Sequence, residues 1–146
     1  MSYTKGQKYC IDTHAWIQFF TGGIKNEILL KILGNECGRK QHYTPTVVIA
    51  EIRKNYIMNN NDEIFDKHFR EICQKSDILK LDKHTAILGG IIKKTKQIPY
   101  TGDKLKCDDI GLIDCIVMAH ASSKRVKVLT GDQHFKELKI TKYVGE

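Results

Sequence analysis

Four acidic side chains stand at positions from which they could build one metal site. Asp12 and Asp132 each follow a short apolar run, whereas Glu51 and Asp114 each lie early in a stretch with helical periodicity. In an open α/β sheet, ligands bind beyond the carboxyl ends of the strands. Two acids at strand ends and two at helix starts are therefore predicted to converge at that edge of the sheet.

Carboxylates that share a pocket stay ionised only when cations neutralise them. Oxygen ligands without a supporting cysteine or histidine pattern favour Mg²⁺ or Mn²⁺. The chain itself is basic, with a formal net charge of +7 from 24 Lys and Arg against 17 Asp and Glu, which favours polyanionic partners. A divalent-metal site in a basic protein predicts phosphodiester chemistry. The basic side chains gather in four stretches, at 93–96, 104–106, 124–127 and 136–142.

Each acid also has a simpler structural explanation. Asp12 could cap the helix that follows it, and Asp114 could be a first-turn acid favoured by the helix dipole. Asp132 could stabilise its own turn, and Glu51 could be an ordinary exposed helix residue. These roles are compatible with metal binding, so the sequence leaves them open. The shared placement of the four acids supports the metal-site hypothesis.

Composition is typical of a globular protein with one domain over residues 1–146. Of the 146 residues, 41% are apolar and 28% charged, and no apolar run reaches the length of a membrane span. Without a signal-peptide pattern at its start, the chain is expected to be cytoplasmic and not bound to a membrane. The five cysteines form no Cys-x-x-Cys pair, which argues against a zinc ribbon. Cys10, Cys73 and Cys115 have apolar neighbours and are predicted to be free core residues.

The predicted elements alternate between strands and helices, which indicates an α/β fold with a parallel sheet covered on both faces. In one predicted helix Thr44 is the N-cap and Pro45 the first helical residue. The polar segment 97–109 is predicted to be a loop over the acidic site. Strands are predicted at 8–11, 78–81 and 126–129, and helices at 14–20, 24–33, 44–58, 64–73, 85–94 and 111–124.

Four segments in order resemble a PIN domain. They are Cys10-Ile11-Asp12-Thr13 and the stretches 44–51, 111–119 and 129–135, so the resemblance runs from residue 9 to about residue 138. Within that family the chain is most similar to compact VapC-type toxins. The resemblance implies a three-layer α/β/α domain with a central, mainly parallel sheet.

The resemblance also implies a Mg²⁺- or Mn²⁺-dependent endoribonuclease. By position, Asp12, Glu51, Asp114 and Asp132 match the metal-binding carboxylates of the family. Thr13 and Thr130 match the hydroxyl positions beside the first and last acids, where they would orient the acids or a metal-bound water. The chain departs from the family at His134, because many members have a further acid there.

A toxin of this kind implies three partners: an RNA substrate, a cognate antitoxin that covers the acidic pocket, and a second copy in a homodimer. Trp16, Phe19 and Phe20 are candidates for an apolar groove that receives the antitoxin, with core packing as the alternative for at least two of them. Two other functions remain open, a noncatalytic RNA-binding PIN scaffold and a ribosomal-RNA processing nuclease. A metal-free mechanism through His14 and His134 is a further alternative. An aspartyl-phosphate phosphatase is disfavoured, because the chain has Asp12-Thr13-His14 where that class has Asp-x-Asp.

Overall fold

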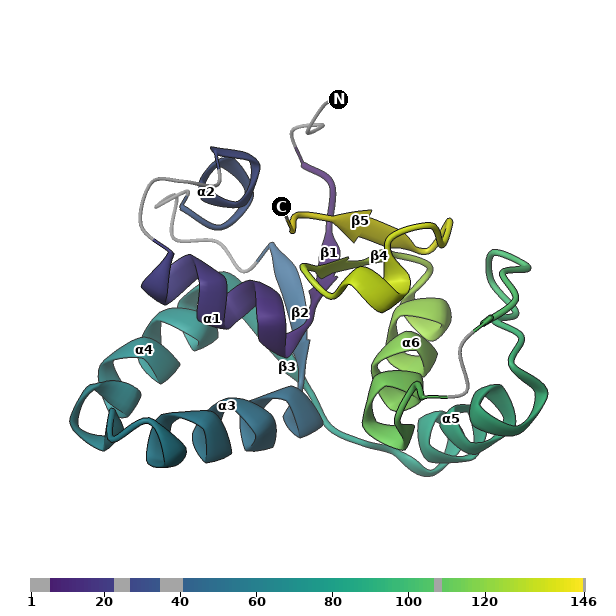
Figure 1. The fold of residues 1–146 in the computed structure, drawn as a ribbon, viewed down its shortest axis with the longest axis horizontal. Helices are drawn as coiled ribbons and strands as arrows, with labels where there is room; N and C mark the ends of the chain where they lie inside the picture. The colour runs from purple at the N-terminus through teal and green to yellow at the C-terminus, as the bar shows by residue number, and fades with distance from the viewer. Residues whose placement is uncertain (1–5, 23–26, 35–40, 107–108, 146) are drawn as a thin grey trace.

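The computed structural model describes residues 6–22, 27–34, 41–106 and 109–145 (Figure 1). A five-stranded sheet in the order β3-β2-β1-β4-β5 occupies the centre, and all neighbouring strands are parallel. Figure 1 shows α1 to α4 on one side of the sheet and α5 with α6 on the other. The predicted α/β/α architecture is therefore confirmed, and the sheet is wholly parallel.

The strands are short and their apolar side chains form the core. They are β1 (Tyr9–Ile11), β2 (His42–Pro45), β3 (Ser76–Leu79), β4 (Lys127–Thr130) and β5 (Thr141–Tyr143). The helices are α1 (Thr13–Thr21), α2 (Glu27–Leu33), α3 (Thr46–Met58), α4 (Asp62–Lys75), α5 (Lys83–Thr95) and α6 (Leu112–Lys124), with a 3-10 turn η2 at Gln133–Phe135. Among the described helices, none has the length and hydrophobicity of a transmembrane segment.

The prediction that a helix begins at Thr44 and Pro45 is wrong. Both residues belong to β2, and α3 begins one residue later, with Pro45 at its N-cap in an extended conformation. Thr44 is fully buried, where its hydroxyl oxygen accepts a hydrogen bond from Trp16 Nε1 at 3.1 Å and pairs with Ser76 Oγ at 2.7 Å. Ser76 Oγ in turn donates to the Ile72 carbonyl. This buried chain ties α1 to the middle of the sheet, so Trp16 is a core residue and not part of an exposed groove.

The described part of segment 97–109, residues 97–106, does not line the acidic cavity, which contradicts the prediction of a loop over it. Ile98 is fully buried and the Tyr100 backbone N–H donates to Ser122 Oγ, near the end of α6 that is distant from Asp114. The Asp103 carboxylate accepts hydrogen bonds from the backbone N–H groups of residues 139 and 140, just before β5. These anchors hold the segment at the end of the sheet opposite the strand ends that carry the acids.

His42 links α2 to the sheet through both ring nitrogens. Its Nδ1 accepts from the Tyr9 backbone N–H at 3.2 Å, and its Nε2 lies 3.3 Å from the Ile32 carbonyl, to which it donates in that tautomer. Burial lowers the pKa of His42 to about 4, so the ring is neutral at physiological pH. His42 is thus a structural residue. Cys10 and Cys115 are buried and free as predicted, Cys73 is half-buried, and Cys37 and Cys107 lie outside the described residues.

Two adjacent glycines in α5 provide a matched test of how closely α5 packs on α6. A Cβ at Gly89 would lie 2.8 Å from Ile116 Cγ1 and 3.2 Å from Ile116 Cα, whereas a Cβ at Gly90 would meet nothing within 4 Å. We expect Gly89→Ala to lower the free energy of unfolding by about 1–3 kcal/mol through overpacking. We expect Gly90→Ala to raise it by about 0.5–1 kcal/mol through helix propensity. Urea denaturation of both variants checks this, and equal effects would contradict the close helix contact.

Candidate active site

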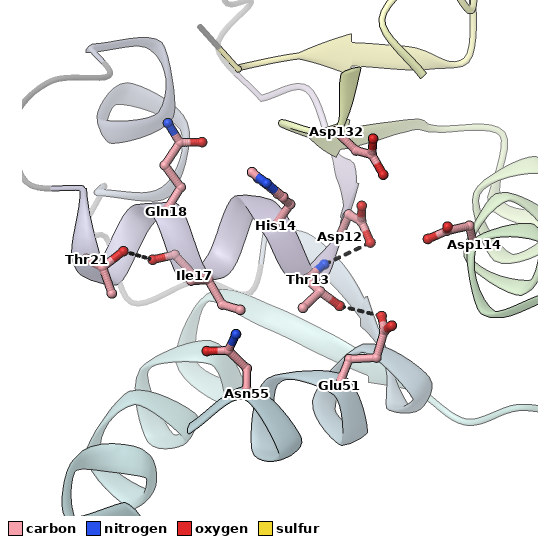
Figure 2. Close-up of a pocket in the computed structure, with 10 residues that line it drawn as sticks. All are labelled: Asp12, Thr13, His14, Ile17, Gln18, Thr21, Glu51, Asn55, Asp114 and Asp132. Carbon is pink, nitrogen blue, oxygen red and sulfur yellow. Dashed lines mark hydrogen bonds between the residues drawn. The ribbon is translucent and has the colours of Figure 1, made fainter. Parts of the chain in front are cut away.

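The four predicted acids line one cavity of about 560 Å³ at the carboxyl edge of the sheet (Figure 2). Asp12 follows β1, Asp132 follows β4, Glu51 lies in the second turn of α3, and Asp114 lies in the first turn of α6. Figure 2 shows their side chains directed toward a common space from four separate elements. The convergence expected from the sequence is therefore present.

Asp12 is the most deeply placed of these acids, with 5% of its surface exposed. Its Oδ1 accepts a hydrogen bond from the Thr13 backbone N–H at 2.8 Å, and its Oδ2 accepts one from Thr130 Oγ1, also at 2.8 Å. Burial raises the pKa of Asp12 above its ordinary value; the two hydrogen bonds oppose that rise and the charges of Glu51 and Asp132 add to it. The two hydrogen bonds therefore fix the orientation of the Asp12 carboxylate, but they do not offset the cost of burying its negative charge.

The two threonines position three of the acids. Thr13 Oγ1 donates to Glu51 Oε1 at 2.7 Å. Thr130 Oγ1 donates to Asp12 and accepts from the Asp132 backbone N–H at 3.1 Å. Thr13 lines the cavity, whereas Thr130 is fully buried behind Asp12. Both residues therefore act on the geometry of the carboxylates, which is one of the two roles that the resemblance implied for them.

Asp114 faces the other three acids across the cavity. Its pKa is raised to about 7, first because burial penalises the charged form and then because Asp12, Glu51 and Asp132 repel it. No lysine or arginine of the described chain lines this cavity to offset the repulsion. The metal-free site is therefore short of positive charge at neutral pH.

The simpler structural roles are also observed. Asp12 is the N-cap of α1, and Asp114 is the first-turn acid of α6. Asp132 caps η2, where its Oδ1 accepts from the His134 backbone N–H at 2.9 Å. Figure 2 shows that the side chains of these three acids also point toward the cavity. Capping and cavity lining are therefore not alternatives here.

Further residues line the cavity that were not predicted from the sequence. Asn55 lies one turn after Glu51 on α3, and Ile17 and Thr21 continue the face of α1 that begins at Thr13. The sequence contains a signal for these residues, because each lies four or eight positions after Glu51 or Thr13 and so on the same face of the helix. His14, which was expected near the acids, lines the cavity; His134 does not, although its Nδ1 lies 3.0 Å from Asp132 Oδ1.

The residues of this cavity fit a divalent cation. Four carboxylates offer hard oxygen donors to a site that no lysine or arginine of the described residues lines. Among the described residues, no three His, Cys, Asp or Glu side chains are close enough together in this structure to coordinate one metal ion. Asp12, Glu51, Asp114 and Asp132 are the residues that would hold it.

The sequence match and the fold agree on a family. The model of the family described as "PIN domain" matches residues 9–140. The chain belongs to the PIN domain family. No curated protein matches the sequence.

Solved structures with the same fold include three from bacteria. They are a toxin–antitoxin complex from Klebsiella pneumoniae (TM-score 0.67, covering 94% of this chain and 98% of that one), VapBC2 from Rickettsia felis bound to a DNA fragment from their promoter (0.65, 92% and 96%), and DNA-bound VapBC from Salmonella typhimurium (0.65, 94% and 96%). Each is 14% identical to this chain, so the likeness establishes the PIN fold alone.

The raised pKa of Asp114 predicts a pH-dependent stability in the absence of metal. The pKa of Asp114 is about 7 in the folded chain, whereas its ordinary value is 3.8. Between these two pH values the folded state therefore binds more protons than the unfolded state. Stability falls as the pH rises through this range. Asp114→Asn removes the charge, so in EDTA at pH 8 the variant should melt at a temperature about 2–6 °C above that of the wild type. The difference should shrink toward pH 5.

The control is Asp66→Asn, which removes an exposed acid on α4. That variant should show no pH-dependent difference in melting temperature from the wild type. Equal melting temperatures of wild type and Asp114→Asn at pH 8 would contradict the uncompensated charge at the site.

Proposed function

We propose that this PIN domain is a Mg²⁺- or Mn²⁺-dependent endoribonuclease and the toxin of a VapBC-type toxin–antitoxin pair. The observation that carries the proposal is the single cavity in which Asp12, Glu51, Asp114 and Asp132 meet without a neutralising lysine or arginine among the described residues. The basic net charge of +7 supports a polyanionic substrate. The whole domain 1–146 is proposed to act in the cytoplasm.

The bound cation would supply charge stabilisation at the phosphate and lower the pKa of a water molecule. The protein contributes the placement of its carboxylates. Thr130 holds Asp12 from behind and Thr13 holds Glu51, so these two acids keep fixed directions before substrate arrives. Asp114 and Asp132 close the cavity from the α6 and β4 sides. Asn55 adds an amide beside Glu51 that can orient a phosphate oxygen or a water molecule.

The direct test is cleavage of a structured RNA pool by the purified protein in Mg²⁺, Mn²⁺ or EDTA. We expect metal-dependent cleavage that falls at least about a thousandfold in Asp12→Ala and Asp114→Ala, the loss typical when transition-state stabilisation is removed. Glu63→Gln, which changes an exposed acid on α4, should cleave as the wild type does. RNA binding without cleavage in every metal would favour the scaffold alternative, and cleavage that survives EDTA would refute the metal mechanism.

An antitoxin is proposed as the protein partner, supported by the likeness of the fold to toxin–antitoxin complexes. Phe19 and Phe20 are half-buried on α1, beside the cavity face of that helix, and Phe20 stacks on His68 at 4.0 Å between ring centroids. These two rings are the part of the predicted aromatic groove that a partner can reach. Trp16 lies beneath them in the core.

A homodimer is proposed through α5 and α6. Ile87 and Ile91, four residues apart on α5, are 55% and 49% exposed, and Leu112 at the start of α6 is 52% exposed. Such residues on two packed helices suit an isologous contact. Ile87→Glu should convert a dimer to a monomer in light scattering. The matched control is Ile57→Glu on α3, where the isoleucine is 52% exposed. A monomeric wild type would contradict the proposal.

A further inference from the structure

A second cavity, of about 510 Å³, adjoins the acidic one. The two share His14, Gln18 and Asp132 as lining residues. The second cavity extends from these toward His134 and Tyr143 on the β5 side of the site. A chain whose phosphate lies among the acids would therefore pass directly into this neighbouring space.

Planar groups make the walls of the second cavity. Its described lining offers two imidazole rings, one phenol ring and two side-chain amides, and no aliphatic side chain. The His134 side chain is 58% exposed, so one face of its ring is available to a ligand. Lys136 Nζ lies 5.4 Å from the centroid of the Tyr143 ring, which places a cation at the rim. Rings with an adjacent cation are the elements that stack bases and contact phosphates.

Gly131 permits the close packing at the junction of the two cavities. A Cβ at this position would lie 2.8 Å from His14 Nδ1 and 3.0 Å from Gln18 Oε1, so a side chain here would displace both. Gln18 Oε1 is buried and accepts no hydrogen bond from the described residues. Gly131 therefore lets the His14 and Gln18 side chains lie against the backbone where the two cavities meet.

We propose that the second cavity binds the base of a nucleotide next to the scissile phosphate of single-stranded RNA, with His134 as the stacking surface. The proposal rests on the endoribonuclease function proposed above. The volume of the second cavity lies in the usual range of small-molecule ligand pockets. His134 stands where many members of the family have an acid, and its proposed role is to bind the RNA base.

The test measures binding with Ca²⁺ in place of Mg²⁺ or Mn²⁺, so that a cation offsets the charge of the acids, and gel electrophoresis checks that the RNA stays intact. Fluorescence anisotropy with a fluorescein-labelled single-stranded RNA of about ten nucleotides gives the dissociation constant. His134→Ala should weaken binding about fivefold to tenfold through loss of stacking. His134→Phe should stay within about twofold of the wild type, because a ring is kept while the contact with Asp132 is lost. His84→Ala, at an exposed histidine on α5, is the matched control and should bind as the wild type does.

The outcomes separate the two proposals. Wild-type binding and cleavage with unchanged affinity in His134→Ala would overturn the base site and leave the nuclease function standing. Equal weakening in His134→Ala and His134→Phe would show that His134 acts through Asp132, which also overturns stacking. A wild-type protein that neither binds nor cuts RNA would overturn both. A changed base preference beside the cut in His134→Ala, with Mn²⁺ and a randomised RNA, would support the base site.

Discussion

The site depends on one buried carboxylate at the centre of the sheet. Asp12 leaves β1, the middle strand, and is held by the Thr13 backbone N–H and the Thr130 hydroxyl. The Thr130 hydroxyl also accepts from the Asp132 backbone N–H, so the Asp12 and Thr130 side chains join β1 and β4 at their carboxyl ends. Any change in the pairing of these two strands would move two acids at once.

The candidate active site is electrostatically unfavourable in the absence of a cation. Hydrogen bonds fix the direction of the carboxylates but do not neutralise them, and the pKa of Asp114 at about 7 reflects that deficit. Among the described residues, no lysine or arginine lines the cavity to offset this charge. The uncompensated charge supports the proposal that the four acids bind a cation.

The sequence alone predicted the residues of the site better than the strands that carry them. Asp12, Glu51, Asp114 and Asp132 could be recognised because strand ends and helix starts have local signals. Strand β2 could not, since Thr44 and Pro45 have the local signature of a helix start, and burial against Trp16 and Ser76 decided otherwise. Strand β5 has three half-buried residues and no alternation long enough to detect. The loop at 97–109 was misplaced because the position of its described part depends on tertiary contacts, such as those of Tyr100 and Asp103, which leave no local signal in the sequence.

The most direct test of the central claim is a calorimetric titration of the metal-free protein with Mn²⁺ at pH 7.5, beside the double variant Asp114→Asn with Asp132→Asn. We expect the wild type to bind one or two ions and the double variant to bind at least about tenfold more weakly, because two of the four oxygen donors lose their charge. Equal affinity in both proteins, or no binding by the wild type, would contradict a cation site formed by these four acids.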